Sequence, residues 1–487
     1  MSTPTSLLRA FRPQVQERLY DFYEELRSAD DLFWDRTLRA WVATGHAVVS
    51  KAVDAPGLSS VRYPDIEDVS EELRPLAQVL SRQMLYNDAP DHPRLRALIS
   101  KAFTPRAVQT LRGRIGEAVD RIITRAAPTG RMDIVADLAR PLPLTIICDL
   151  LDIPDQDRPA LASWSEPVAE AIGNSRLDAD RNREASRSMT DMLAYFRELL
   201  TRPDTPPAPH TLRALVSAQA ENTDQDLDEL LANCALLLIA GHETTTHFIG
   251  NATLALLRHP HAADQLRGRP DLMPAAVEEL LRYDAPVQLM LRRARHDLDL
   301  AGRSIAEGQT VLLVGGAANR DPAVFPDPHV LDFERPGGRH MAFGHGPHFC
   351  LGAALARLEG AIVLEALLTR LPGLRLDGTA PQWQRSLNFR GLTRLDVAFT
   401  STSDDHDSGN QAVPASSSPY GVDSVTPAGA CPARPGPGHV AGPAINERPL
   451  RAGPGRRAPP NPNLPGHPVA ARHTPGPQAL PYNKPLW

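Results

Sequence analysis

The 487-residue sequence has few cysteines and few aromatic residues: four Cys, with Phe, Trp and Tyr together making up 5%. Cys148, Cys234, Cys350 and Cys431 lie far apart, and the first two stand in apolar runs, which predicts reduced thiols and no disulfide framework. The longest apolar run, LANCALLLIAG, is about half of the ~20 residues that a membrane-spanning helix needs. Since the N-terminal segment also lacks the apolar core of a signal peptide, we expect a cytoplasmic protein without a membrane anchor.

An excess of charge of either sign is also lacking. The formal net charge is −6, from 52 Lys and Arg against 58 Asp and Glu. Proteins that bind nucleic acid over a large surface need a marked positive excess, so nucleic acid is not expected as a partner. The hydrophobic content of 42% is enough for a large folded core, and the length allows one to three domains.

The composition changes near residue 400. Of the 47 prolines, 18 fall within 401–487, in strings such as ARPGPGHVAGP, and no apolar period of a helix or strand continues there. Such a segment buries too little apolar surface to offset its ordering entropy, and its later charges are mostly Arg. We therefore expect a folded domain over 1–400 and a basic, Pro- and Gly-rich disordered tail over 401–487.

The folded portion shows mostly helical periodicity, with minor strands placed late in the chain. Thr223 and Asp226 suggest a capping box before the longest helix, and Pro260 follows its end. Helical patterns are expected at 70–85, 94–103, 109–126, 189–200 and 224–259. The β-rich pieces are expected at 297–315 and 374–399. These patterns predict a mainly α-helical domain with a small β component.

One cysteine stands in an unusual setting, FGHGPHFCLG at residues 343–352, just before the apolar helical run AALARLEGAIVLEALLTRL. Backbone N–H groups at a helix start lower the pKa of a nearby thiol and favour thiolate. Three interpretations remain open from the residues alone: a small buried cysteine, a cysteine hydrolase with distant partners, and an axial thiolate ligand of haem iron. A zinc site lacks a second spaced cysteine, because His345 and His348 provide no CxxC partner.

This segment resembles the F-x-x-G-x-H-x-C-x-G signature of the cytochrome P450 family, the haem-thiolate monooxygenases. Phe343, Gly346, His348, Cys350 and Gly352 occupy the specified positions. The resemblance spans about residues 20–400 and is nearest to the soluble bacterial branch. It implies a helix-rich triangular prism that holds haem b between a long central helix and the loop of Cys350, the axial iron ligand. Phe343, Gly344 and Gly352 would line the cofactor.

The long helix carries a polar insertion, GHETTTH, within apolar flanks. A zinc HExxH motif is excluded by spacing, since His247 follows His242 by five residues and so lies off its helical face. A buried acid and alcohol need partners such as water, and this pairing suits proton delivery. The insertion resembles the family's A-G-x-[DE]-T-T motif. By that resemblance Ala240 and Gly241 open a kink above the haem, Glu243 connects to a proton source, Thr244 holds the dioxygen being activated, and Thr245 extends the network.

Further motifs carry scaffold and cofactor roles implied by the same resemblance. VEELLRYDAP and LDFER supply Glu279, Arg282 and Arg335, the buried structural triad that an ExxR motif forms with a downstream arginine. Haem propionates need cationic partners, and the family's pattern assigns His92, Arg96, Arg292 and His348 to them. The implied substrate wall comprises Leu85, Ala240, Val287, Leu289, Met290 and Leu387.

The resemblance implies a monooxygenase that inserts one atom of O2 into a small organic or carrier-bound substrate, in the tailoring of a secondary metabolite. No flavin or nicotinamide fingerprint is present, so a separate ferredoxin and ferredoxin reductase are expected to dock near the Cys350 loop. Two alternatives are a non-catalytic member that recruits partners, and a peroxide-driven haem enzyme. The intact Cys350, Glu243 and Thr244 weigh against the first, and the retained acid–alcohol pair weighs against the second.

Overall fold

The computed structural model describes residues 6–62, 66–174, 178–201, 211 and 227–401. The expected tail, Cys431 and the proposed cap residues Thr223 and Asp226 lie outside these ranges. The α-helices with described bounds are α1 (Pro13–Gln16), α2 (Leu19–Ala29), α3 (His46–Val53), α4 (Arg74–Leu80), α5 (Asp91–Ile99), α6 (Pro105–Thr110), α7 (Arg112–Ala126), α8 (Pro141–Leu151), α9 (Arg158–Gly173), α10 (Ala179–Thr201), α12 (Leu227–Arg258), α13 (Pro260–Gly268), α14 (Met273–Tyr283), α15 (Gly315–Ala318) and α16 (Ala353–Arg370). Short 3-10 turns η3 (Met84–Tyr86) and η9 (Gly346–His348) and the π-helical segment η6 (Ile134–Ala139) lie between them.

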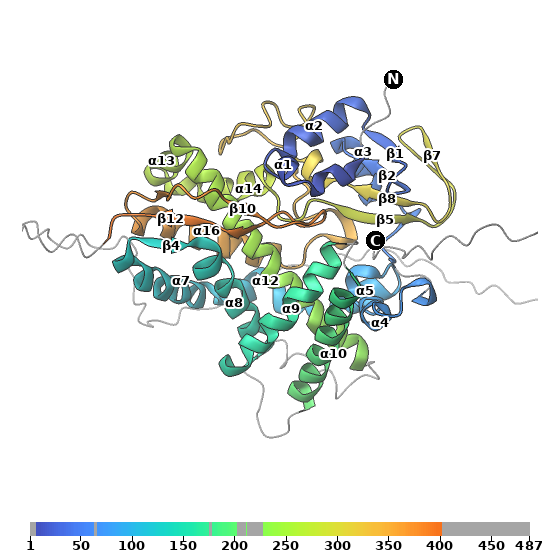
Figure 1. The fold of residues 1–487 in the computed structure, drawn as a ribbon, viewed down its shortest axis with the longest axis horizontal. Coiled ribbons are helices and arrows are strands. Elements are labelled where there is room, and N and C mark those ends of the chain that lie inside the picture. Colours follow the sequence, from blue (N-terminus) through green and yellow to red (C-terminus); the bar gives the residue numbers. More distant parts are fainter. Residues whose placement is uncertain (1–5, 63–65, 175–177, 202–210, 212–226, 402–487) are drawn as a thin grey trace, which may run out of the picture. The chain divides into compact units, whose positions relative to one another are not determined.

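The strands form one larger sheet and three small ones. The five-stranded sheet has the order β1 (Leu32–Asp35), β2 (Ala40–Ala43), β8 (Thr310–Leu313), β5 (Met290–Ala294) and β3 (Leu58–Ser59). The smaller sheets are β4 (Arg131–Asp133) with β12 (Asp396–Ala398) and β9 (Arg375–Leu376), β6 (Leu298–Leu300) with β7 (Arg303–Ile305), and β10 (Gln382–Trp383) with β11 (Leu392–Arg394). Figure 1 shows the five-stranded sheet beside α1, α2 and α3, with α7 to α10 on the other side of α12.

The strands β6 to β8 and β9 to β12 fall within the two predicted β-rich pieces, but β5 and the early strands β1 to β4 lie outside them. The hairpin of β1 and β2 comes early, with Trp34 opposite Trp41, and β2 pairs in parallel with β8 across some 270 residues of sequence. Four-residue strands are too short to show a clear two-residue period, so their pairing depends on the tertiary partner β8. The early hairpin thus completes the sheet that presents β5 to the interior.

The long helix α12 is apolar on nearly all sides. Its buried residues run from Leu230 to Leu256 with few interruptions, as expected for a helix inside a core and not on a surface. It contacts α8, α9, α10, α14 and α16. Its end is fixed by His259 and Pro260, since Pro260 opens α13. The mainly α-helical class with minor strands is therefore as the sequence predicts. None of the helices in the described ranges combines the length and apolar composition needed to cross a membrane.

Candidate functional site

A large cavity lies between α12, α5, β5 and the loop that precedes α16. Its empty volume is about 2050 Å³, which includes solvent at its mouth. Most of the residues singled out in the sequence line it, although they come from segments up to 267 positions apart. These residues are Leu85, His92, Arg96, Ala240, Gly241, Glu243, Thr244, Thr245, Val287, Leu289, Met290, Arg292, Phe343, Gly344, His348, Cys350 and Gly352.

The loop before α16 holds Cys350 at the cavity wall through a tight bend. The backbone N–H of Cys350 donates to the carbonyl of Phe343 over 2.9 Å, which closes the loop. Gly344 and Gly346 have φ values of +67° and +64°, a left-handed conformation that side chains other than glycine rarely adopt. The bend therefore favours glycine at both positions, of which the signature specifies Gly346.

The Cys350 sulfur is accessible from the cavity although protein atoms surround it closely. Burial raises the pKa of the thiol, and this effect outweighs the backbone amides of Gly352 and Ala353 and the charges of Arg96 and Arg357, which lower it. The prediction of a lowered pKa for this thiol is therefore wrong in its net direction. The helix-start amides do point at the sulfur, but their effect is smaller than the cost of desolvating a thiolate.

Four basic side chains gather on the wall beside this loop. His92 and Arg292 are 5% and 7% exposed, and the rings of His92 and His348 lie 4.0 Å apart between centroids. Burial lowers the pKa of Arg292, and burial together with the charges of His92 and Arg292 lowers the pKa of His348 to about 3. Arg96 donates to the carbonyl of Phe349 over 2.8 Å, on the cysteine loop itself.

Among the described residues, no ion pair is assigned to Arg96 or Arg292, and the Asp88 carboxylate lies 4.0 Å from Nε2 of His348. The one hydrogen bond assigned to the Arg292 side chain within the described ranges goes to the adjacent Leu291 carbonyl. The carboxylate near the cluster, Asp88, is already engaged by Ser59, Ser60 and Arg295. A buried cation without a counter-ion is costly. A ligand carrying carboxylates on a flat apolar body would satisfy the cluster, and a porphyrin with two propionates has that chemistry.

Sequence reasoning missed two residues of this cluster. Ser60 Oγ lies 3.1 Å from His348 Nε2, and both residues line the cavity. Arg62 also lines it, with its guanidinium 4.8 Å from the ring centroid of Tyr86. No periodicity or motif marks the segment SVR at residues 60–62, which follows β3. Only the tertiary contact of this segment with the cysteine loop brings it into the site.

On the opposite wall, α12 turns its polar insertion toward the cavity. The Thr244 hydroxyl donates to the Ala240 carbonyl over 2.8 Å, and the Thr245 hydroxyl donates to the Gly241 carbonyl over 3.3 Å. The oxygen of each hydroxyl keeps lone pairs that can accept a bond from the cavity. Threonine bonds of this type bend helices slightly.

The predicted kink at Ala240 and Gly241 is not a break in the helix, because α12 remains α-helical through both residues. The lack of a side chain at Gly241 has a packing reason instead. A Cβ there would lie 2.9 Å from side-chain carbons of Ile147 on α8. Gly241 thus allows the close approach of α8 and α12.

Glu243 lies between the cavity and two buried histidines of the same helix. Its Oε1 is 3.2 Å from Nε2 of His242, and its Oε2 is 3.9 Å from Nε2 of His247. Burial would raise the pKa of Glu243, but the hydrogen bond and charge of His242, with the charges of His247 and Arg140, leave the pKa lowered. Glu243 is therefore held as a partly enclosed carboxylate at the cavity wall.

The residues predicted as a structural triad are brought together away from the cavity. Arg282 is 1% exposed and donates to both oxygens of Glu279 over 2.7 Å. Arg335 Nε donates to Glu279 Oε1 over 3.1 Å. The remaining donors of Arg282 reach the carbonyls of Asn319, Pro328 and Val330. The triad thus fastens the segment after β8 to α14.

The apolar wall differs from the sequence prediction at one position. Leu85, Val287, Leu289 and Met290 line the cavity, whereas Leu387 does not. Leu387 is 2% exposed and packs into the core cluster of the N-terminal helices. Its neighbours Asn388 and Phe389 face the cavity in its place. The turn lies where the sequence predicts it, but the direction of each side chain depends on local backbone geometry that the sequence did not reveal.

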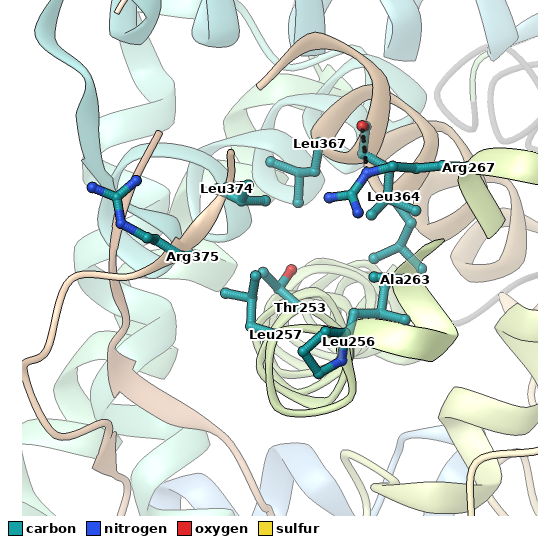
Figure 2. Close-up of a pocket in the computed structure, with 11 residues that line it drawn as sticks. Thr253, Leu256, Leu257, Ala263, Arg267, Leu364, Leu367, Leu374 and Arg375 are labelled. Atoms are coloured by element: carbon teal, nitrogen blue, oxygen red, sulfur yellow. Dashed lines mark hydrogen bonds between the residues drawn. The ribbon is translucent and has the colours of Figure 1, made fainter. Parts of the chain in front are cut away.

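A second, smaller pocket lies elsewhere, between the end of α12, α13 and the far half of α16 (Figure 2). Its empty volume is about 550 Å³. Leucines line most of it, while Arg267 and Arg375 stand at opposite sides, with Arg267 Nε donating to the Leu368 carbonyl over 3.3 Å. Leu364 lies about three turns along α16 from its first residue, so this pocket is separate from the cysteine loop.

Comparison with known proteins agrees with this geometry. Residues 270–381 match the family model "Cytochrome P450". The chain is 36% identical over 386 residues to the biotin biosynthesis cytochrome P450 of Bacillus subtilis (strain 168), covering 78% of this chain and 96% of that protein. It is 37% identical over 389 residues to the cytochrome P450 monooxygenase PikC of Streptomyces venezuelae, covering 78% and 91%.

A solved structure shows the same fold. The crystal structure of P450BioI in complex with an acyl carrier protein carrying hexadec-9Z-enoic acid superposes with a TM-score of 0.75 at 34% identity, covering 80% of this chain and 99% of that one. The chain therefore belongs to the cytochrome P450 family. It is accordingly a monooxygenase that depends on haem iron.

Proposed function

We propose that this cavity holds haem b, with Cys350 as the axial ligand of the iron. The observation that carries the proposal is the joint placement of one accessible cysteine, at a helix start, and a cluster of four basic side chains in which the buried Arg292 has no assigned ion pair among the described residues. His92, Arg96, Arg292 and His348 would bind the propionates. Phe343, Gly344 and Gly352 on one side and Ala240 and Gly241 on the other line the space for the ring.

When bound, haem with a thiolate ligand supplies the activation of dioxygen, since thiolate donation favours cleavage of the O–O bond. The residues of this chain control water and protons around that chemistry. Apolar side chains on both walls limit water in the cavity. The hydroxyl of Thr244 and the carboxylate of Glu243 face the space opposite Cys350, where they can orient and supply protons. Thr245 extends this polar edge.

The substrate that fits this wall is an apolar or mixed organic compound. Leu85, Val287, Leu289 and Met290 give an apolar surface, and Leu85 at 43% exposure stands at the accessible side. P450BioI has been crystallised with a carrier-bound acyl chain, which supports a small organic or carrier-bound substrate for this chain. The reaction would tailor a secondary metabolite. Electrons would come from a separate ferredoxin and its reductase, docking near the Cys350 loop.

Replacement of the cysteine tests the proposal. Cys350→Ala should lose the red-shifted Soret band of the reduced carbon monoxide complex, because that band requires an axial thiolate. The matched control is Cys148→Ala, since Cys148 is buried away from the cavity and burial raises the pKa of its thiol to about 12. An unchanged band in Cys350→Ala, measured beside the control at equal haem content, would refute the ligand assignment.

A further inference from the structure

His242 is fixed in one tautomer by its own helix. Its Nδ1 lies 2.7 Å from the carbonyl oxygen of Leu238, one turn earlier. A carbonyl oxygen only accepts hydrogen bonds, so Nδ1 must carry a hydrogen. The side chain is 4% exposed and does not line the cavity, so no solvent competes for this bond.

The other ring nitrogen faces Glu243. Nε2 of His242 lies 3.2 Å from Glu243 Oε1. With Nδ1 already protonated, a neutral ring offers only a lone pair at Nε2, and a carboxylate also offers only lone pairs. The contact is attractive only when one more proton lies between them, as imidazolium with carboxylate or imidazole with carboxylic acid. The geometry therefore requires the pair to hold one transferable proton.

The side chains around Glu243 hold it between His242 and His247. Three charged or titratable side chains lower the pKa of Glu243, namely His242, His247 and Arg140. His247, 5% exposed, turns Nε2 toward Glu243 Oε2 at 3.9 Å, and no hydrogen-bond partner among the described residues is assigned to either of its ring nitrogens. A Cβ at Gly391 would lie 1.9 Å from its Nδ1, so the ring is tightly confined.

We propose that His242 is a positioning residue that stores the proton which Glu243 delivers into the cavity. Glu243 Oε1 takes the proton from His242 Nε2, and Glu243 then gives it to an acceptor in the cavity, so that imidazole and carboxylate remain. One proton taken up from solvent restores the pair. His247 offers Glu243 a second contact and confines its carboxylate to this side of α12. The inference depends on the role of Glu243 in the proposed function.

The first test measures the proton directly in the reduced, carbon monoxide-bound holoprotein. Nitrogen-15 NMR of labelled histidines, with the His242 signal identified by its loss in His242→Asn, should show a protonated Nδ1 near neutral pH. Glu243→Gln should then change the Nε2 signal of His242, because the carboxylate that shares the proton with Nε2 is gone. A His242 ring protonated at Nε2 alone, or an Nε2 signal that Glu243→Gln leaves unchanged, would overturn the proposal.

The second test uses dioxygen consumption with a surrogate ferredoxin and reductase, without added substrate. His242→Asn keeps a donor for the Leu238 carbonyl but holds no transferable proton, so turnover should fall at least about tenfold at pH 7 and its pH profile should change. His242→Gln, which places a neutral amide near Glu243, should show the same loss and serves if His242→Asn folds poorly. Unchanged rates and profiles in both variants would refute the storage role.

Comparison variants separate this inference from the proposed function. Thr244→Ala and Glu243→Gln should change the ratio of peroxide released to dioxygen consumed, if the polar edge of α12 supplies protons at all. If Thr244→Ala and Glu243→Gln change this ratio but the His242 variants change neither turnover nor its pH profile, only the proton-storage role of His242 is refuted. No effect of any of the four contradicts the proton role of α12 in the proposed function, while the Cys350 test decides the haem site independently.

Discussion

At the scale of single residues, the buried acid Glu359 on α16 stands outside the site. It is 1% exposed, and no hydrogen-bond partner is assigned to its Oε2 among the described residues. Burial raises the pKa of this carboxyl to about 8, so the folded protein holds it neutral at pH 7. In the unfolded chain the same group ionises near its ordinary pKa of about 4.3. Unfolding between these two values therefore releases a proton.

Glu359 consequently makes stability fall as pH rises. Below about pH 4.5 the Glu359 carboxyl makes its full contribution to the free energy of unfolding. Between about pH 4.5 and pH 8 this contribution is progressively lost, by an amount on the order of a few kcal/mol. We expect Glu359→Gln to flatten the decline of the thermal unfolding midpoint between pH 5 and pH 8, measured by circular dichroism on the holoprotein. Equal slopes for the variant and the parent would show that the carboxyl is solvated or paired.

Residue identity alone indicated the chemistry of some positions but not of others. Cys350, Glu243 and Thr244 stand in short motifs whose residue types suit one chemistry, so the sequence marked them. Arg62 and Ser60 stand in no motif, and the place of Ser60 beside His348 follows from a contact between segments almost 290 positions apart. The upward pKa shift of the Cys350 thiol also depends on the surrounding fold, because desolvation is a property of burial and not of sequence.

At the scale of elements, the crossing of α12 and α16 depends on one glycine. A Cβ at Gly360 would lie 2.3 Å from a ring carbon of Phe248, which is 1% exposed and cannot move freely. We expect Gly360→Ala to destabilise the protein by about 1–3 kcal/mol through overpacking. Phe248 also lines the cavity, so the same change should disturb haem content. The measurement is thermal unfolding together with the haem-to-protein ratio.

The matched control for this prediction lies in α7. A Cβ added at Gly116 would have no other atom within 4 Å apart from its own helix backbone and chain neighbours. There, Gly→Ala only restricts the unfolded chain and improves helix propensity, which stabilises by about 0.5–1 kcal/mol. The two Gly→Ala changes should therefore act in opposite directions. A stabilising effect of Gly360→Ala would mean that α12 and α16 are farther apart than the structure places them.

At the scale of the whole molecule, distant parts of the chain meet in one buried polar network. Tyr20 Oη on α2 donates to Asp284 Oδ1 over 2.9 Å, and Arg390 Nε donates to the same oxygen over 2.7 Å. Asn251 on α12 donates to the Arg390 carbonyl over 2.9 Å. The N-terminal helix, the end of α14 and the last strands are thus joined to the central helix next to the cavity wall at Phe389.

This arrangement predicts where the chain can be shortened. Ser401 Oγ donates to the Pro128 carbonyl over 3.0 Å, and β12 pairs with both β4 and β9. Truncation after Ser401 should leave haem content and the unfolding midpoint nearly unchanged, because the composition of 402–487 predicts no packed core. Truncation after Leu395, which removes β12, is the control and should destabilise the protein. A large loss in the first truncation would make the tail part of the fold.

The sequence by itself determined the helical class, the long central helix, the glycine bend before Cys350 and the acid–alcohol pair, because each depends on residues close together in the chain. Local periodicity and short motifs record such features directly. The tertiary structure decided the early hairpin, the inward turn of Leu387, the gathering of the basic cluster beside the Cys350 loop and the contact of His242 with Glu243. Each of these depends on burial or on distances between side chains, and these quantities exist only after the chain has packed.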